Sequence, residues 1–229
     1  MNGRRFVAHA ASLIAALAIW CGPVAASGGA GITADQALQK LMDGNKHYVA
    51  QQMTNQKMSD QHVRESLSKG QKPYAIILSC SDSRVPPEII FDKGLGEIFV
   101  VRVAGNVPDP IILGSIEYAA EHLGSPLIMV LGHERCGAVT AAVEAKGKPE
   151  GNIGAIVKAI NPAVAQARKE YKGTDKAQLV EIAINDNVKL VEANLTQHSP
   201  ILKHLVKEGK IKIVAAKYDL DDGKVTLMQ

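Results

Sequence analysis

Cysteine and aromatic residues are scarce in this chain of 229 residues, which has three Cys, three Phe, five Tyr and one Trp. Three cysteines cannot form the disulfide framework that stabilises many small secreted domains. Charge of one sign is also lacking, because 26 Lys and Arg face 23 Asp and Glu. Since no Lys/Arg-rich run is present, the sequence excludes a basic surface for nucleic acid. Hydrophobic residues make up 46% of the chain, which excludes global disorder.

The first 26 residues have the composition of an export signal. Arg4 and Arg5 give a positive start, an apolar run covers residues 6–20, and small residues occupy 24–26, as a signal peptidase requires. The run of about 15 residues is shorter than the roughly 20 that a membrane-spanning helix needs. We therefore predict cleavage after Ala26 and a periplasmic location. An uncleaved anchor is the alternative, and the export route (Sec or twin-arginine) stays open.

Short apolar runs alternate with helical patterns in the rest of the chain. Runs typical of strands buried on both faces occur at residues 74–78, 98–101, 127–131 and 211–215. Apolar residues at helical spacing occur between them at residues 111–123, 136–146, 153–170 and 175–197. This alternation predicts an α/β fold with four parallel strands flanked by helices. A terminal edge strand is expected near residues 224–228, and residues 27–229 are expected to form one domain.

An N-terminal helical arm is predicted over residues 33–70, before the first strand. Its first helix would begin after the cap residue Thr33 and end or bend at Gly44-Asn45, because both residue types are unfavourable inside helices. Its second helix would cover residues 60–69.

Two polar loops, 79–84 and 132–137, follow the first and third predicted strands. In parallel sheets the functional groups lie just beyond the carboxyl ends of the strands. His133 and Cys136 are close enough in sequence to bind one ion, and Cys80 would join them if the two strands are neighbours. Two Cys and one His suit tetrahedral Zn²⁺ with an open fourth position, which favours a catalytic site. The alternatives are a Cys80–Cys136 disulfide, or buried thiols beside an unrelated histidine.

Asp82 and Arg84 lie two positions apart in the first of these loops and can form an ion pair. The guanidinium would keep the carboxylate ionised, so that Asp82 could only accept hydrogen bonds. Beside a metal-bound hydroxide, Asp82 would accept the remaining proton and orient an oxygen lone pair. Two thiolate ligands neutralise Zn²⁺, so the bound water should have a pKa above the ~7 of a site with three histidines. An exposed ion pair without a catalytic role is the alternative.

The joint motif Cys-x-Asp-x-Arg and His-x-x-Cys-Gly resembles the β-class carbonic anhydrases, and the resemblance covers most of residues 27–229. It implies that Cys80, His133 and Cys136 bind one zinc ion per subunit. It also implies that Asp82 and Arg84 form the dyad that orients the zinc-bound hydroxide. The expected reaction is the reversible hydration of CO₂ to bicarbonate and a proton.

The resemblance extends to substrate-binding positions. Gln71 matches a glutamine whose amide hydrogen-bonds a substrate oxygen, and Gly137 matches a glycine whose backbone approaches the substrate. Phe99 and Tyr118 match apolar wall positions, although an ordinary core role is the alternative for both. The chain departs from many family members in having Val103, not Asn, after the arginine of the second strand.

The single Trp lies in the predicted signal, and a subset of the family places a Trp beside a bicarbonate pocket that moves the aspartate onto zinc. We therefore expect the open form, with Asp82 on Arg84 and water on zinc. The resemblance also implies a homodimer or a dimer of dimers, with the N-terminal arm around the partner and the active sites near the interface. No stable membrane insertion is expected after cleavage.

Two other functions stay open from the sequence. One is hydrolysis of a CO₂-like molecule, CS₂ or COS, on the same scaffold. The other is a zinc- or redox-binding module without catalysis. No proton shuttle is evident, because the remaining histidines of residues 27–229 are expected at surface or packing positions.

Overall fold

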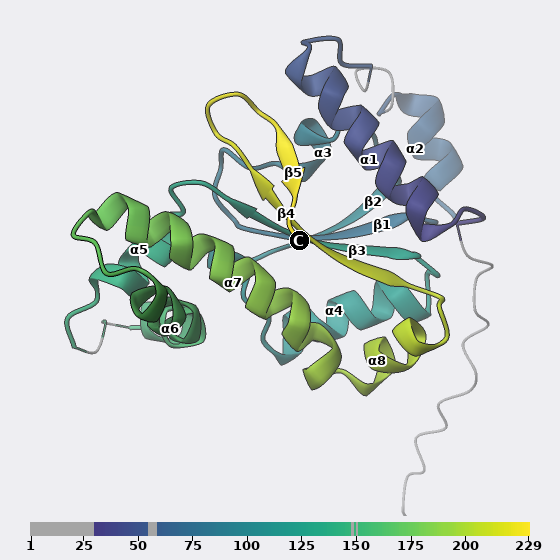
Figure 1. Ribbon diagram of the computed structural model, residues 1–229. Helices are drawn as coiled ribbons and strands as arrows, with labels where there is room; N and C mark the ends of the chain where they lie inside the picture. The colour runs from purple at the N-terminus through teal and green to yellow at the C-terminus, as the bar shows by residue number, and fades with distance from the viewer. Residues whose placement is uncertain (1–29, 55–58, 148, 150) are drawn as a thin grey trace, which may run out of the picture.

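The computed structural model describes residues 30–54, 59–147, 149 and 151–229. The predicted export signal, residues 1–26, lies outside the described residues. The described chain forms one five-stranded sheet with helices on both faces (Figure 1), which confirms the predicted α/β class. None of its helices is long and apolar enough to cross a membrane.

The strands are β1 (Ala75–Ser79), β2 (Ile98–Arg102), β3 (Leu127–His133), β4 (Lys212–Tyr218) and β5 (Val225–Leu227). Their order across the sheet is β2-β1-β3-β4-β5. The first four strands are parallel, and β5 pairs with β4 in the antiparallel sense. Ser79 is in register with Arg102 of β2 and Leu131 of β3. The carboxyl ends of these three strands therefore lie along one edge of the sheet.

The helices are α1 (Ala34–Val49), α2 (Gln61–Leu67), α3 (Pro87–Ile90), α4 (Pro110–Glu121), α5 (Gly137–Glu144), α6 (Ile153–Glu170), α7 (Lys176–His198) and α8 (Pro200–Lys207), with a 3₁₀ turn η2 (Ala104–Asn106). The sequence patterns predicted the longer helices. They did not predict α3, η2 or α8. The start of α8 could have been predicted, because Ser199 is a favourable N-cap residue and Pro200 is favourable at the first helical position.

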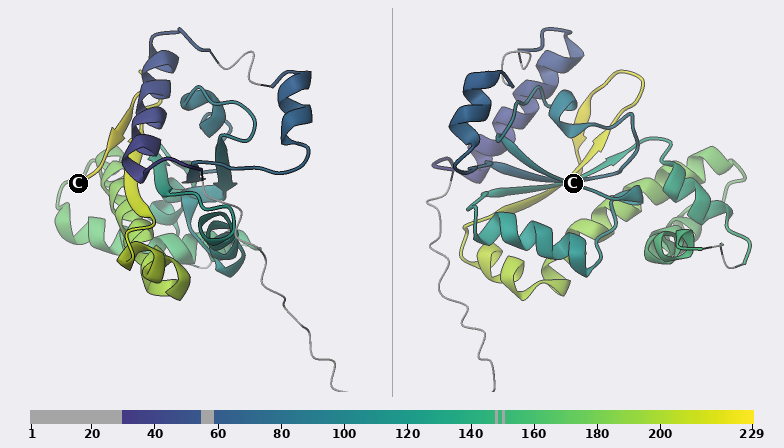
Figure 2. Two further views of the ribbon diagram at one scale, coloured as in Figure 1. Left: turned by 90° about the vertical axis from the view of Figure 1, so that its right-hand side faces the viewer. Right: turned by 180° about the vertical axis from the view of Figure 1, so that it is seen from behind.

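The sheet divides the core into two layers, and helices cover each layer. In Figures 1 and 2, α1 and α3 lie on one face of the sheet, whereas α4, α7 and α8 lie on the other. Side chains of β1 alternate accordingly: Ile76 and Leu78 pack in the layer of α4 and α7, and Ala75 and Ile77 pack in the layer of α1. Because β1 is buried on both faces, its sequence is a continuous apolar run.

The expected end or bend of α1 at Gly44-Asn45 is wrong, because the helix continues to Val49. Gly44 allows α1 to approach the backbone of Phe91 closely, because a Cβ at this position would lie 1.8 Å from the carbonyl oxygen of Phe91. The Asn45 amide donates to the carbonyl of Ile90 (3.2 Å) and of Gly223 (2.9 Å). Tertiary contacts therefore outweigh the low helix propensity of both residues.

The sheet reverses its winding between β1 and β3. The chain leaves β1 toward β2 on one side and leaves β3 toward β4 on the other. In parallel sheets, the crevice outside the carboxyl ends of the strands at such a reversal is the usual position of a site.

The close approach at Gly44 gives a test of the packing of α1. We expect Gly44→Ala to lower the free energy of unfolding by about 1–3 kcal/mol, because a backbone carbonyl opposes the new methyl group. Gly154→Ala is the matched control: this glycine is also inside a helix, and a Cβ there would make only an ordinary contact, 3.4 Å from the carbonyl oxygen of Pro149. The control should gain about 0.5–1 kcal/mol. Urea unfolding measures both, and equal stabilities would contradict the packing described.

Candidate metal centre

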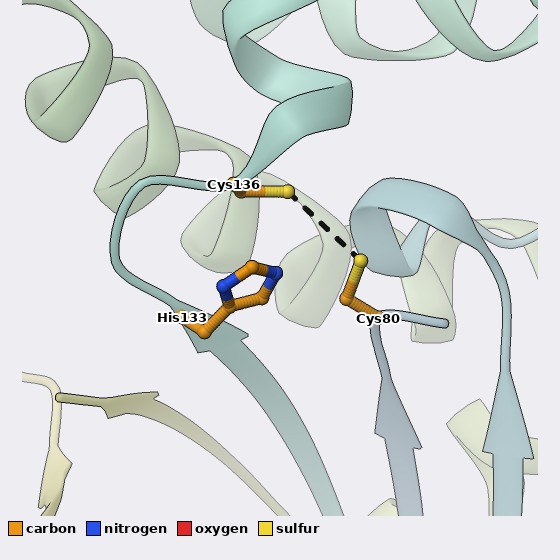
Figure 3. A group of neighbouring side chains, drawn as sticks. All are labelled: Cys80, His133 and Cys136. Carbon is orange, nitrogen blue, oxygen red and sulfur yellow. Dashed lines mark hydrogen bonds between the residues drawn. The ribbon is translucent and has the colours of Figure 1, made fainter. Parts of the chain in front are cut away.

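Three potential ligands meet in the crevice between β1 and β3 (Figure 3). Cys80 follows β1 directly, His133 is the last residue of β3, and Cys136 precedes α5. All three residues are buried, and their ligand atoms lie within 4.8 Å of one another. The side chains point toward one another in Figure 3. The neighbouring strands thus bring together the residues that the spacing predicted.

The distances among these groups fit a tetrahedral metal ion. The two Sγ atoms are 4.0 Å apart, which is about twice the S–S bond of a disulfide, roughly 2.05 Å. Two sulfurs at about 2.3 Å from a tetrahedral Zn²⁺ would lie about 3.8 Å apart. Among the described residues, both cysteines are free. The geometry therefore fits two metal ligands better than a disulfide.

The histidine is oriented for the same purpose. His133 Nδ1 lies 2.8 Å from the carbonyl oxygen of Glu134, so Nδ1 carries the proton and donates it. Nε2 is buried and has no hydrogen-bond partner among the described residues. An unpartnered buried lone pair is costly, and a metal ion beside the two sulfurs would satisfy it.

The two thiol groups form a hydrogen-bonded pair, with their sulfurs 4.0 Å apart. A hydrogen bond from Cys136, with another from the backbone N–H of Gly105, holds the pKa of Cys80 below its ordinary value. The bond to Cys80 and burial raise the pKa of Cys136. A divalent cation would displace the proton of this hydrogen bond, because it stabilises both sulfurs as thiolates.

Asp82 and Arg84 form the predicted ion pair at the rim of this pocket. Arg84 Nε donates to Asp82 Oδ1 at 2.9 Å, and Nη2 donates to Oδ2 at 2.8 Å. The backbone N–H of Arg84 also donates to Oδ1, at 3.0 Å. These bonds hold the pKa of Asp82 well below its usual range. Asp82 Oδ2 lies 3.9 Å from His133 Nε2, so an ionised acceptor stands beside the ligands.

Arg102, to which the sequence assigned no role, supports the same loop. Its Nε donates to the carbonyl of Cys80 at 3.0 Å, and its Nη2 donates to the carbonyl of Asp82 at 2.6 Å. The planar guanidinium therefore holds two alternate peptide units of the loop in one geometry. Only the position of an arginine at the end of β2 could have indicated this contact.

The predicted substrate-binding residues divide into two groups. Gly137 is the first residue of α5 and adjoins Cys136. No described atom lies within 4 Å of the point where its Cβ would stand, so its backbone faces open space beside the ligands. Gly137 therefore adjoins a potential ligand, and its contact with substrate stays a prediction.

Gln71, Phe99 and Tyr118 lie elsewhere in the chain. Gln71 precedes β1 and lines a groove with residues of α2, whereas Cys80 follows the other end of β1, about 17 Å along a strand of five residues. Phe99 is in register with Ile76 near the start of β1, and its ring is 6.4 Å from that of Tyr118. Within one chain these three residues form no wall around the metal centre.

Removal of one sulfur should abolish tight metal binding. We expect purified wild-type protein to contain about one zinc per chain and Cys136→Ser to lose it, because a hydroxyl is a poor zinc ligand. Ser81→Ala is the control, since Ser81 adjoins Cys80 but its side chain is exposed. Metal analysis and thiol titration, with and without a chelator, measure the result. Equal zinc in wild type and Cys136→Ser would contradict the ligand set.

Comparisons with known proteins agree with this geometry. The carbonic anhydrase family matches residues 75–225. Carbonic anhydrase 2 of Mycobacterium tuberculosis (strain CDC 1551 / Oshkosh) is 41% identical over 194 residues, which cover 83% of this chain and 91% of that protein.

Solved structures share the fold. The β-carbonic anhydrase CafA of Aspergillus fumigatus superposes with a TM-score of 0.69 at 26% identity, over 85% of this chain and 90% of that one. A tetrameric β-carbonic anhydrase of Sordaria macrospora has a TM-score of 0.66 at 22% identity, over 85% and 95% of the two chains. The extent of these matches, together with the Cys, His and Cys ligands at the carboxyl ends of β1 and β3, shows that the chain belongs to the β-class carbonic anhydrases.

Proposed function

We propose that this carbonic anhydrase is zinc-dependent and hydrates CO₂ to bicarbonate and a proton with the help of the Asp82–Arg84 pair. The observation that carries the proposal is the unpartnered Nε2 of His133, buried beside two sulfurs 4.0 Å apart and 3.9 Å from the Asp82 carboxylate. The named relatives are carbonic anhydrases, which favours CO₂ over CS₂ or COS. Membership of an enzyme family also disfavours a non-catalytic module.

Zinc bound to Cys80, His133 and Cys136 would supply a Lewis acid that lowers the pKa of water and yields a nucleophile near neutral pH. Asp82 would accept a hydrogen bond from the reacting water and so orient its lone pair toward the carbon of CO₂. Because the residue stays ionised, Asp82 cannot donate, so only one orientation of the nucleophile is favoured.

Two arginines hold Asp82 in this role. Arg84 fixes both carboxylate oxygens, and Arg102 fixes the backbone carbonyl of the same residue. The exposed backbone of Gly137 leaves room for an uncharged substrate. Bicarbonate then leaves, and the proton of the next water passes to buffer, since no shuttle group is assigned.

We further propose that the active site is completed by a second copy of the chain. Gln71, Phe99 and Tyr118 match substrate-binding positions but lie at the wrong end of β1 to act in their own chain. Tyr118 is 48% exposed, and Ile111 on the same helix is 79% exposed. A homodimer or dimer of dimers would cover these side chains, and the partner subunit's Gln71 would approach the metal centre.

We also propose that the protein is exported to the periplasm. The support is the composition of residues 1–26, with its positive start, apolar run and small residues at 24–26.

The role of Asp82 can be tested by substitution. We expect Asp82→Asn to lower kcat/KM for CO₂ hydration by about 100-fold, a typical cost of losing a positioned proton acceptor, while zinc content is unchanged. The control is Asp222→Asn, which breaks another ion pair between residues i and i+2, with Lys224, in an exposed turn. Stopped-flow hydration assays measure both variants. Full activity of Asp82→Asn would remove Asp82 from the mechanism.

The pH profile tests the origin of the nucleophile. The pKa of Asp82 is depressed, so its charge is lost only at strongly acidic pH and it does not titrate near neutrality. The hydration rate should therefore rise with pH through an apparent pKa above about 7, set by water beside two thiolates. Initial rates across about pH 6 to about pH 9 measure this limb. A flat profile over that range is the result that would refute the assignment.

A further inference from the structure

One helix contacts the loop between His133 and Cys136 and also the loop after β2, which hydrogen-bonds Cys80. In Figures 1 and 2, α7 runs along the face of the sheet that α4 and α8 also cover, with its amino-terminal half beside α5 and α6. It packs against β3, α5 and β4. None of the residues of α7 belongs to the motifs from which the site was predicted. One of its polar side chains nevertheless reaches a ligand loop, and another reaches the loop after β2 that hydrogen-bonds a ligand.

Glu181 of α7 holds the loop between His133 and Cys136. Its Oε1 accepts the backbone N–H of Arg135 at 2.8 Å, and its Oε2 accepts Lys217 Nζ at 2.8 Å. Arg135 has a φ of 49°, a left-handed conformation that is unfavourable for a residue with a side chain. The carboxylate therefore stabilises a backbone turn on which the separation of two ligands depends.

Asn187 of α7 supports the third ligand through the loop after β2. Its side-chain amide donates to the carbonyl oxygen of Gly105 at 2.9 Å. The N–H of Gly105 in turn donates to Cys80 Sγ at 3.3 Å. Gly105 has a φ of 72°, and Asn187 is only 3% exposed. The amide thus holds Gly105 by its carbonyl, while the N–H of the same residue hydrogen-bonds the sulfur.

Val188, the next residue of α7, packs closely against β3. A Cβ at Gly132, which adjoins His133, would lie 2.2 Å from Val188 Cγ2. The backbone of β3 and the helix therefore approach as closely as a glycine allows. Contacts at residues 181, 187 and 188 leave α7 little freedom to move relative to the ligands.

We propose that Glu181 and Asn187 are positioning residues of the metal centre: Asn187 sets the hydrogen bond to the Cys80 sulfur, and Glu181 sets the loop that spaces His133 and Cys136. This inference rests on the proposed zinc function. Outer hydrogen-bond partners of this kind typically change metal affinity by about 10- to 100-fold. Neither residue touches the substrate, so neither is catalytic.

The hydrogen bond to sulfur gives Asn187 a spectroscopic signature. In protein loaded with Co²⁺, an N–H···S bond lowers the energy of the sulfur lone pair. We expect Asn187→Leu, which keeps the size but not the donor, to shift the sulfur-to-cobalt charge-transfer band to longer wavelength. Zinc release to a chelator should also be about 10-fold faster. The matched control is Asn194→Leu, the same change two turns further along α7, which should keep both wild-type values.

A second variant keeps the test possible if the first does not fold. If Asn187→Leu does not fold, Asn187→Ser replaces it, because a shorter side chain cannot reach Gly105 and the same shift is expected. A folded variant with the wild-type band and release rate would overturn the role of Asn187. Wild-type protein that binds neither zinc nor Co²⁺ would instead refute the proposed function.

Two substitutions of Glu181, by Ala and by Gln, distinguish a positioning role from a general effect on stability. Glu181→Ala removes the acceptor for Arg135, and we expect zinc release to become about 10-fold faster. Glu181→Gln keeps an acceptor oxygen but weakens the pair with Lys217, and it should restore a release rate close to wild type. Equal acceleration in both variants would assign the effect to the ion pair and overturn the role of Glu181. An unchanged rate in Glu181→Ala would overturn it as well.

Discussion

The parallel pairing of β1 with β3 is the constraint on which the site depends. The register that places Ser79 opposite Leu131 puts Cys80 beside the end of β3, although 53 residues separate it from His133. The sheet also reverses its winding between these strands, which is where parallel sheets usually place a site. A shift of one residue in this register would point Cys80 to the other face of the sheet.

Burial makes this arrangement both useful and costly. Two sulfurs and a histidine nitrogen belong to residues that are at most 4% exposed, an environment in which unpaired polar atoms are unfavourable. The structure compensates with hydrogen bonds from outside the ligand set: the carbonyl of Glu134 fixes His133, and the N–H of Gly105 faces Cys80. A cation would add to this compensation, because it would accept one lone pair from each of the three ligand atoms.

The sequence predicted the parts of the molecule that local physics determines. Buried parallel strands are continuous apolar runs, so the four runs were visible, and ligand types at strand ends indicated a metal. The end of α1 was predicted wrongly because Gly44 and Asn45 serve contacts with Phe91, Ile90 and Gly223, which lie far away in the chain. The contacts of Arg102 and α7 could not be predicted from the sequence either, since hydrogen bonds between distant segments leave no periodic pattern in it.

Charge explains why so many residues serve the orientation of one carboxylate. In the proposed mechanism two thiolates would neutralise the divalent ion, so an ionised Asp82 nearby would oppose further negative charge and could not promote the nucleophile by charge. Its contribution must come from geometry, which requires that its oxygens stay fixed. Arg84 and Arg102 provide that rigidity in the first loop, as Glu181 does for the second. These contacts therefore restrict the motion of the two loops that carry the ligands. Few polar contacts are needed for the substrate itself, because CO₂ is small and uncharged.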